Sequence, residues 1–449
     1  MSSPDTIAAI ASAPGRGAVG VIRVSGPGVP HIAQEILGFL PMPRLAQVAN
    51  FRSSSGEALD RGLALYFPAP ASYTGEHVLE LQGHGGALIM DLLLQRLLGM
   101  GCRMARPGEF SERAFLNGKI DIAQAEAIAD LIDAGTTAAA RAAVRSMQGE
   151  FSARINALQV QITELRTLVE AAIDFPDEEL EFLPGSVLGR RMANILAGFE
   201  SITAAARQGA LLREGLNVVI AGRPNAGKSS LLNNLVGDEI AIVTDQPGTT
   251  RDVLRQHVHL DGLPLNLIDT AGLRTAVDVV EAEGVRRALN EVDRADRVLY
   301  ILDHAAARPQ DWRAELQELP PGVPLTLVFN KIDLSGAAPR ADESLDPPQV
   351  FLSAKTGEGV ALLREHLKTR AGYVSGESGA LSARRRHLDA LRRAKACVEQ
   401  AAQTLAETRA FELFAEELRR AQLALGEITG EFTSDDLLGE IFSSFCIGK

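Results

Sequence analysis

A short glycine-containing loop near the middle of the chain has the residue types and spacing needed to hold a nucleoside triphosphate. Gly222 and Gly227 are followed by Lys228 and Ser229, which completes the pattern G-x-x-x-x-G-K-S. A β-type apolar run precedes this loop and a helical pattern follows it, as a P-loop requires. In such a loop, backbone N–H groups and the lysine ammonium hold phosphates, while the serine hydroxyl binds Mg²⁺. The predicted phosphate-binding residues are Asn225, Ala226, Gly227, Lys228, Ser229 and Ser230.

Two later segments supply groups for the γ-phosphate and the metal ion. The segment from Gly248 to Asp252 is expected to be a mobile loop in which Thr250 joins Ser229 on Mg²⁺. Asp269 follows an apolar run, which predicts a strand end near the metal. Hydrolysis is expected to release both loops. The nucleotide-binding residues predicted here are Thr244, Asp245, Gln246, Pro247, Gly248, Thr249, Thr250, Asp269, Thr270, Ala271 and Gly272.

A third group of residues predicts which base is bound. Asn330, Lys331 and Asp333 follow another apolar run. The Asp333 carboxylate can accept from the N1–H and exocyclic amine of guanine, which adenine does not offer. The segment expected to close over the base is Ser353, Ala354 and Lys355. Four such motifs in this order predict GTP as the nucleotide and resemble the TRAFAC-class GTPases over roughly residues 216 to 370.

The way in which water is activated must differ from that of many small GTPases. Leu273 stands where those proteins have a glutamine. A monovalent cation such as K⁺ would neutralise developing charge in place of an arginine finger, an effect worth roughly 10³ to 10⁵ in rate. The oxygen ligands predicted for K⁺ come from Asn225, Thr244, Gln246 and Thr249. The alternative for Asn225 is a residue that only caps the loop.

Three charged residues near the switch segments are candidates for catalysis, besides Lys228. Glu281 is the first candidate for orienting the attacking water, and Glu283 is its nearest rival. The alternative for either glutamate is an ordinary carboxylate on a helix surface. Arg251 is a further catalytic candidate because it lies within the first switch segment.

The elements that must position these residues form several domains, because 449 residues exceed one ordinary core. Short β-type runs predict a small N-terminal α/β domain, and apolar residues at helical spacing then predict amphipathic helices. Buried runs alternating with helical patterns predict a doubly wound, mainly parallel sheet. The predicted multidomain fold, α/β plus all-α, has the P-loop domain inserted into a helical bundle domain. The predicted segments are 1–118, 119–214, 215–372 and 373–449.

Composition limits the classes of partner. The formal net charge of −12 argues against a protein that coats nucleic acid through bulk electrostatics, so any RNA contact must be local. The three cysteines are far apart, which fits a reducing cytosol and offers no disulfide or zinc spacing. The apolar stretch from Ala87 to Met100 contains charged residues and is too short to predict a membrane span. We therefore expect a cytoplasmic protein with no membrane contact.

Several weaker signals are assigned ordinary roles. The string Gly15–Gly20 matches G-x-G-x-x-G but leads into a β-type run, which excludes a Rossmann loop. The acidic run Asp174–Glu181 is expected to be a solvated connection rather than a metal site. The basic cluster near Arg384–Lys395 is either a solvated helix face or a site that binds phosphates. His84, among glycines, is expected to serve a turn.

Sequence segments outside the GTPase motifs are far more specific, and they extend over the whole chain. They are Val21–Gly26, Thr74–Glu76, Leu79–Gly86, Gly108–Asn117, Gln124–Asp130 and Cys446–Lys449. Together they closely resemble the MnmE (TrmE) family of tRNA modification GTPases. The resemblance implies a folate-binding-like, dimerising N-terminal domain, a helical domain and an inserted GTPase domain. It also implies a homodimer that forms a heterotetramer with MnmG (GidA), a partner that holds FAD and uses NADH.

The resemblance further implies a reaction and residues for it. A one-carbon unit of 5,10-methylenetetrahydrofolate, or of a 5-formyl-tetrahydrofolate analogue, would be used to add an aminomethyl or carboxymethylaminomethyl group to C5 of the tRNA wobble uridine. Arg23, Glu80, Lys119 and Lys449 would hold the folate, and Cys446 would act in the modification chemistry. A small apolar tail residue is the alternative for Cys446. His77 departs from the Asp expected after Thr-Gly-Glu.

Two other functions are compatible with the GTPase motifs. One is a regulatory GTPase that assists ribosome or tRNA maturation by binding alone. The other is a folate aminomethyltransferase that merely carries a GTPase and needs no tRNA. The C-terminal Cys446 and the set Arg23, Glu80 and Lys119 favour the modification enzyme, because a binding switch needs none of them.

Overall fold

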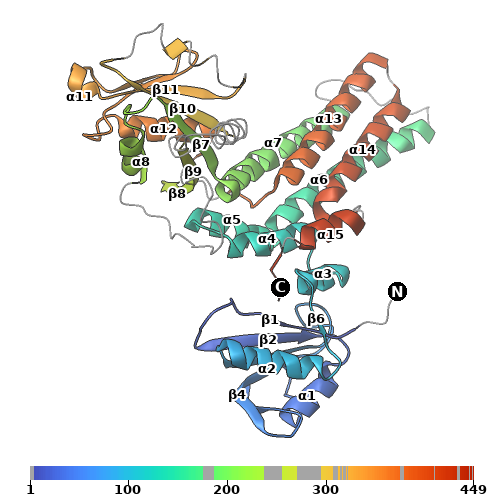
Figure 1. Ribbon diagram of the computed structural model, residues 1–449. Helices are drawn as coiled ribbons and strands as arrows, with labels where there is room; N and C mark the ends of the chain where they lie inside the picture. The colour runs from blue at the N-terminus through green and yellow to red at the C-terminus, as the bar shows by residue number, and fades with distance from the viewer. Residues whose placement is uncertain are drawn as a thin grey trace, which may run out of the picture. The chain divides into compact units, whose positions relative to one another are not determined.

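The chain forms two compact units, each of which is assembled from segments distant in sequence. Unit 1 comprises 1–129, 147–195 and 392–449, and unit 2 comprises 130–146 and 196–391. The structure is a computed structural model (Figure 1). It describes residues 5–174, 187–236, 255–269, 295–306, 312–313, 316, 320, 322–374, 379–408, 410–431, 435–443, 445, 446 and 448.

The N-terminal part of unit 1 is a six-stranded sheet in the order β3-β4-β5-β2-β1-β6. β1 pairs parallel with β6, and the other neighbours pair antiparallel. Alternating residues of β2 are buried, which places Ile22 and Val24 in a core with residues of α1 and α2. The elements are β1 (Ile7–Ile10), β2 (Val19–Ser25), α1 (Val29–Leu37), β3 (Gln47–Arg52), β4 (Ala58–Phe67), β5 (Val78–His84), α2 (Ala87–Leu98), β6 (Arg103–Met104) and α3 (Glu109–Leu116).

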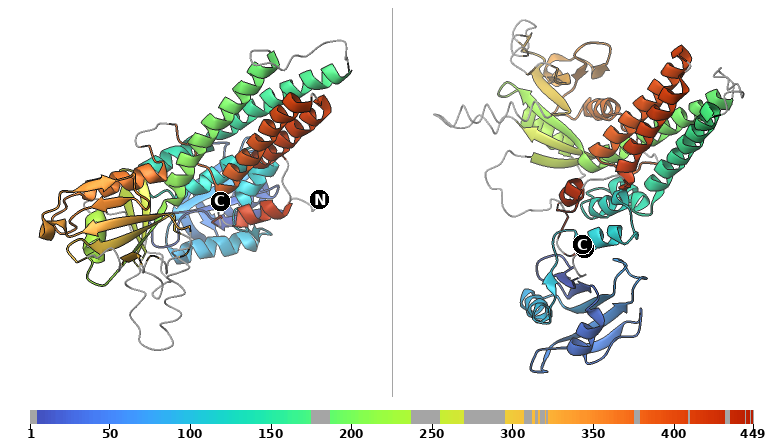
Figure 2. Two further views of the ribbon diagram at one scale, coloured as in Figure 1. Left: turned by 90° about the horizontal axis from the view of Figure 1, so that it is seen from above. Right: turned by 90° about the vertical axis from the view of Figure 1, so that its right-hand side faces the viewer.

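The remaining helices follow the predicted helical spacing. The stripe Ile155, Leu158, Ile162, Leu165 and Val169 is buried along α6 (Glu150–Asp174), which lies beside α14 (Phe411–Thr429) in all views (Figure 1 and Figure 2). The other helices are α4 (Ile122–Ile132), α5 (Thr137–Met147), α7 (Val187–Glu214), α13 (Arg385–Thr408) and α15 (Asp435–Ser443). Among the described helices, none is both long and apolar enough to cross a bilayer.

Unit 2 contains a seven-stranded sheet in the order β12-β13-β11-β10-β7-β9-β8. β9, β7, β10, β11 and β13 run parallel, and the two edge strands are antiparallel. Apolar side chains of α8 and α12 cover one face, while Trp312 and Leu316 pack on the other. The elements are β7 (Leu216–Gly222), α8 (Lys228–Val236), β8 (Arg255–Leu260), β9 (Leu263–Asp269), β10 (Arg297–Asp303), β11 (Leu325–Asn330), α11 (Ile332–Ser335), β12 (Arg340–Asp342), β13 (Gln349–Phe351) and α12 (Val360–Ala371).

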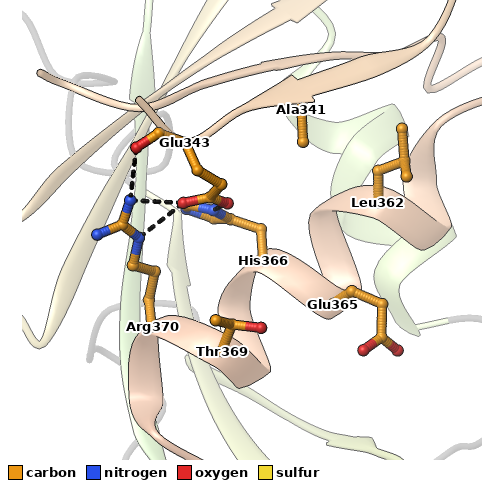
Figure 3. A pocket seen from close by; sticks show the side chains of 7 residues that line it. All are labelled: Ala341, Glu343, Leu362, Glu365, His366, Thr369 and Arg370. Carbon is orange, nitrogen blue, oxygen red and sulfur yellow. Dashed lines mark hydrogen bonds and ion pairs between the residues drawn. The ribbon is translucent and has the colours of Figure 1, made fainter. Parts of the chain in front are cut away.

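A chain of polar contacts fastens α12 to the sheet (Figure 3). Arg297 Nη1 donates to Thr326 Oγ1 at 3.0 Å, and Thr326 lies 2.8 Å from Nε2 of the buried His366. His366 Nδ1 faces Glu343, which also accepts from Arg370 Nε at 2.9 Å. A neutral His366 satisfies every partner, because the Thr326 hydroxyl can donate to Nε2 while Nδ1–H donates to the carboxylate.

A pocket of about 570 Å³ opens beside this chain of contacts. Its lining residues are Ala341, Glu343, Leu362, Glu365, His366, Thr369 and Arg370 (Figure 3). None of them belongs to a predicted nucleotide motif. The charged groups of Glu343 and Arg370 pair with each other, and Glu365 pairs with Lys368. The charges on the pocket wall are therefore largely neutralised by ion pairs.

Acidification is expected to destabilise unit 2 through His366. Burial, aided by the charges of Arg297 and Arg370, lowers the pKa of His366 below its usual 6.5 despite the neighbouring Glu343. The unfolded chain therefore takes up a proton at this site before the folded chain, and stability is lost as the pH falls through about 6.5. The unfolding temperature, followed by calorimetry, should drop by about 2–4 °C between roughly pH 7.5 and 5.5 from this group.

His366→Gln is the matched variant, because its amide does not titrate. The difference in unfolding temperature between the two pH values should be smaller in this variant than in the parent chain. An identical difference in both chains would show that His366 does not cause the acid sensitivity.

Candidate active site

The parallel strands of unit 2 bring the predicted nucleotide motifs to one edge of the sheet. Gly222 at the end of β7 is in register with Ile301 of β10, and Asp303 of β10 is in register with Asn330 of β11. Ligand sites form where the carboxyl ends of such strands open into loops. Residues that are distant in the chain therefore meet at this edge.

The loop between β7 and α8 has the geometry of a phosphate cradle. Asn225 and Gly227 have positive φ angles of 61° and 97°, which turn the backbone tightly before α8 begins at Lys228. The Lys228 ammonium is held inside this loop by the carbonyls of Gly222 and Arg223, each 2.9 Å from Nζ. The N–H groups of the first turn of α8 and this ammonium together present positive charge to a phosphate.

Ser229 is the residue of this loop that is predicted to bind Mg²⁺. Ser229 and Ser230 are exposed in the first turn of α8. Mg²⁺ prefers oxygen ligands and usually takes one or two from the protein together with phosphate oxygens. The exposed Ser229 hydroxyl fits this requirement.

Asn330 joins two loops. One is the phosphate loop between β7 and α8, and the other is the segment Ser353–Lys355, here called the base loop because it is predicted to close over the base. Its side chain is buried, with Nδ2 donating to the Ala226 carbonyl at 2.8 Å and Oδ1 accepting from the Ala354 N–H at 2.8 Å. A buried amide with both ends paired is costly to displace. The predicted residue Asn330 therefore joins the loop predicted to bind the phosphates to the segment predicted to close over the base.

The base-side residues are also brought together. Asp333 is exposed, and its Oδ1 accepts from the Ser353 hydroxyl at 2.7 Å. The Thr356 N–H in turn donates to Ser353 Oγ at 3.2 Å. These contacts fix the Asp333 carboxylate with one edge available for a base. Lys355, two residues after Ser353, is exposed, and Lys331 Nζ lies 2.7 Å from Asp303 Oδ2.

Many of the predicted switch residues fall outside the described part of the chain. The backbone of Asp269 is in register with Ile220, which places the end of β9 at the same sheet edge as the phosphate loop. The predicted residues outside the described ranges are Thr244, Asp245, Gln246, Pro247, Gly248, Thr249, Thr250, Arg251, Thr270, Ala271, Gly272, Glu281, its rival Glu283, and Lys449.

A second group of predicted residues lies in unit 1. Arg23 Nε donates to Glu80 Oε1 at 3.0 Å, and its guanidinium carbon lies 5.7 Å from the ring centroids of both Tyr73 and Phe110. Lys119 is exposed, and its side chain lies against Gly75. Arg23 and Glu80 therefore meet on the neighbouring strands β2 and β5, while Lys119 lies against the segment that precedes β5.

The C-terminal tail reaches the same part of unit 1. The Gly108 N–H donates to the Cys446 carbonyl at 3.3 Å, and Arg23 Nη1 donates to the Gly448 carbonyl at 3.4 Å. The Cys446 side chain is exposed. His77, the departure from the expected pattern, stacks on Tyr66 with Nδ1 2.7 Å from the Tyr66 hydroxyl, so it has a local packing partner.

Two residues of the base side were not predicted. Asp303 pairs with Lys331, and Asn234 donates to the Ala354 carbonyl. An aspartate at the end of a buried run was the available signal for Asp303, since parallel strands end at the ligand edge. Asn234 carried no signal, because polar residues on helices are ordinarily solvated.

The similarity of this chain to known proteins extends over its whole length. The family model described as the MnmE helical domain matches residues 122–446, and the model described as the GTP-binding protein TrmE N-terminus matches residues 6–119. The tRNA modification GTPases MnmE of Proteus mirabilis (strain HI4320) and Yersinia pseudotuberculosis serotype I (strain IP32953) are both 56% identical to this chain over 454 residues, covering 100% of each sequence. The chain belongs to the MnmE family.

Two solved structures share part of this MnmE-family chain. The G domain of the T. maritima FeoB iron transporter is 30% identical, covering 35% of this chain and 98% of its own, with a TM-score of 0.26. A variant of Aquifex aeolicus Era bound to GDP and AlF4⁻ is 28% identical, covering 41% and 66%, with a TM-score of 0.27.

Family membership confirms several predictions from sequence. The chain is a P-loop GTP hydrolase, and the predicted combination of N-terminal, helical and GTPase domains is confirmed. The domain limits and the roles of the individual site residues stay predictions.

Gly227→Ala is expected to weaken GTP binding by at least about tenfold, because it breaks the contact between the two loops. A Cβ at Gly227 would stand 2.1 Å from Asn330 Nδ2, which is buried and cannot move without losing its bond to Ala226. Titration with a fluorescent GDP analogue measures the change.

Gly372→Ala is the matched control, because Gly372 also has a positive φ, 67°, but has no atom within 4 Å of its Cβ position. It should lose some stability and keep its nucleotide affinity. Equal affinities of the two variants for GDP would contradict the role assigned to Asn330.

Proposed function

We propose that this chain uses GTP hydrolysis to drive modification of the wobble uridine of certain tRNAs in the cytoplasm. The modification adds an aminomethyl or carboxymethylaminomethyl group to C5, with one carbon supplied by a tetrahydrofolate derivative. A homodimer of this chain works with MnmG (GidA), which holds FAD and uses NADH. The observation that carries the proposal is the contact between the C-terminal tail and Arg23.

The contact between the C-terminal tail and Arg23 supports the one-carbon chemistry, because the tail makes this contact only with a specific backbone conformation at Gly448. Gly448 has a φ of 99°, and a Cβ there would stand 2.5 Å from the Ile10 carbonyl oxygen. Only glycine therefore fits this approach. Phe442 and Phe445, with ring centroids 5.6 Å apart, pack into the cluster that anchors the tail. The segment that carries Cys446 is thus held between two fixed points.

The chemistry of the N-terminal residues suits a folate. Glu80 accepts from Arg23, so a carboxylate and a guanidinium stand side by side, with the aromatic rings of Tyr73 and Phe110 beneath. Such a group offers a hydrogen-bond acceptor and a cation for a carboxylate, and the partly exposed Tyr73, unlike the fully buried Phe110, adds apolar surface for a planar ring. The folate would supply the methylene carbon, while Cys446 would present its thiol to the same site.

The phosphate loop supports hydrolysis by electrostatic stabilisation. Lys228, which lies in the phosphate loop, and the amides at the start of α8 would face the transferred phosphoryl group, where negative charge develops. Thr250 would complete the Mg²⁺ site with Ser229, and Glu281 would orient the water, with Arg251 nearby. Asp333 would select guanine.

The N-terminal sheet supports a homodimer because it leaves apolar side chains exposed at its outer strands. Val48 of β3 and Leu63 of β4 are paired in register and are 61% and 38% exposed. The preceding connection adds exposed Leu40, Met42 and Leu45. Exposed apolar side chains on and beside an edge strand are typical of an interface between chains.

Replacing Cys446 with Ser is expected to abolish tRNA modification while GTP hydrolysis stays within about twofold of the parent rate. The thiol is distant in sequence from the phosphate loop and would act only in the modification chemistry. Nucleoside analysis by mass spectrometry of tRNA from a deletion strain complemented with each variant measures the modification.

Cys397→Ser is the control, since it removes another thiol that is only partly exposed on α13. It should keep both activities. Normal wobble modification in the Cys446→Ser strain would instead favour a regulatory GTPase that acts by binding alone.

K⁺ is expected to stimulate hydrolysis more than Na⁺, by at least about tenfold, because it neutralises charge developing on the phosphates. Asn225 has the left-handed φ of 61° and an exposed side chain at the phosphate loop, which suits an oxygen ligand. Thr244, Gln246 and Thr249 would supply the remaining ligands. Phosphate release assays in KCl and NaCl at equal ionic strength measure the ratio.

The stimulation should disappear in Asn225→Ala. Equal rates of the parent protein in both salts would remove the cation from the mechanism, and stimulation that survives in the variant would remove Asn225 from the ion's ligands.

A further inference from the structure

Two residues, one at the end of β10 and one directly after it, hold the segment from Asn330 to Asp333, which is predicted to bind the guanine base. Asp303 Oδ2 lies 2.7 Å from Lys331 Nζ, and both side chains are only partly exposed, at 26% and 29%. Partial burial alone would raise the pKa of Asp303, but the hydrogen bond and charge of Lys331 outweigh it and lower that pKa. The Asp303 carboxylate is therefore ionised at neutral pH.

His304 fastens the same loop through its backbone and its ring. The His304 N–H donates to the Asn330 carbonyl at 2.8 Å, and Nδ1 lies 2.8 Å from the Ser335 hydroxyl of α11. The ring packs edge-on against Phe329 and Phe351, which stack on each other with centroids 4.7 Å apart. This packing keeps the end of β10 rigid, so that Asp303 can hold Lys331 in one position.

Lys331 stands between the two residues that define the base side. Asn330 on one side joins the phosphate loop, and Asp333 two residues later faces the position of the base. The four methylenes of Lys331 can lie against a planar base, while its ammonium has three N–H donors, of which Asp303 takes one. A free lysine side chain has many rotamers, so holding it in one orientation lowers the entropy lost on binding.

We propose that Asp303 is a positioning residue for guanine nucleotide binding, which acts by fixing the Lys331 side chain across the base site. This goes beyond the GTP hydrolysis of the family and is independent of the tRNA chemistry. Asp303 need not touch the nucleotide. Its contribution reaches the nucleotide through Lys331.

The competing explanation is that Asp303 only caps a turn. Its Oδ1 accepts from the Ala305 N–H at 3.0 Å, whereas Oδ2 holds Lys331. Asp303→Asn separates these roles, because the amide keeps one oxygen for the turn and replaces the other with an NH₂ group that cannot accept from an ammonium. Asp342→Asn is the matched control, since Asp342 likewise caps a turn, through Ser344, and does not contact the base loop.

The test is a double-mutant cycle on GDP affinity in the full-length protein, with Asp303→Asn, Lys331→Met and both together. Methionine keeps an apolar stem and removes the ammonium. We expect Asp303→Asn to weaken GDP binding about tenfold, as loss of a charge-assisted contact would, and to add less than about twofold in the Lys331→Met background. Asp342→Asn should bind GDP as the parent protein does.

Three results would overturn the proposal. The first is an Asp303→Asn protein with the parent affinity for GDP. The second is a tenfold loss that persists in the Lys331→Met background, which would show that Asp303 acts through the turn. The third is an equal loss in Asp342→Asn, which would show a general effect of turn capping. Unfolding temperatures of all variants, measured alongside, show that each is folded.

Discussion

The buried amide of Asn330 is the contact on which the nucleotide site depends. One end binds the phosphate loop at Ala226, and the other end binds Ala354 of the base loop. A triphosphate and a base are joined by a ribose of fixed size, so a site that reads both must hold its two loops at a fixed separation. A buried side chain with both polar ends paired supplies that constraint, because neither loop can move without exposing an unsatisfied group.

The glycine of the phosphate loop follows from the same contact. Gly227 packs so closely on Asn330 Nδ2 that no side chain fits, and its φ of 97° is one that L-residues rarely adopt. The glycine therefore serves the backbone turn around the phosphates and the approach of the second loop. The parallel strands make this possible, since β7, β10 and β11 end at one edge and place the three loops side by side.

The sequence predicted the structure where the residues that determine it are neighbours in the chain. Continuous apolar runs predicted the buried parallel strands, and the spacing of Gly222 to Ser229 predicted the phosphate loop, because both signals lie within a few residues. Asp303 with Lys331, and Arg23 with Gly448, could not be predicted from spacing, since these partners are 28 and 425 residues apart. The buried His366 gave no signal either, as its hydrogen-bond partners come from β11 and from the residue that follows β12. Glu281 and the first switch segment lie beyond the described residues and stay predictions.

The β8–β9 hairpin adds a mechanical constraint within unit 2. It is the short connection between the two segments predicted to respond to the γ-phosphate, because β8 follows the first and β9 ends at Asp269. Its turn is held at Asp261, whose carboxylate accepts from Lys368 Nζ at 2.6 Å and whose carbonyl accepts from the Tyr373 hydroxyl at 3.1 Å. Tyr373 packs in turn with residues of α5. A shift of β9 on hydrolysis would therefore have to carry these contacts with it or break them, so the hairpin links the nucleotide edge to a helical segment outside the sheet.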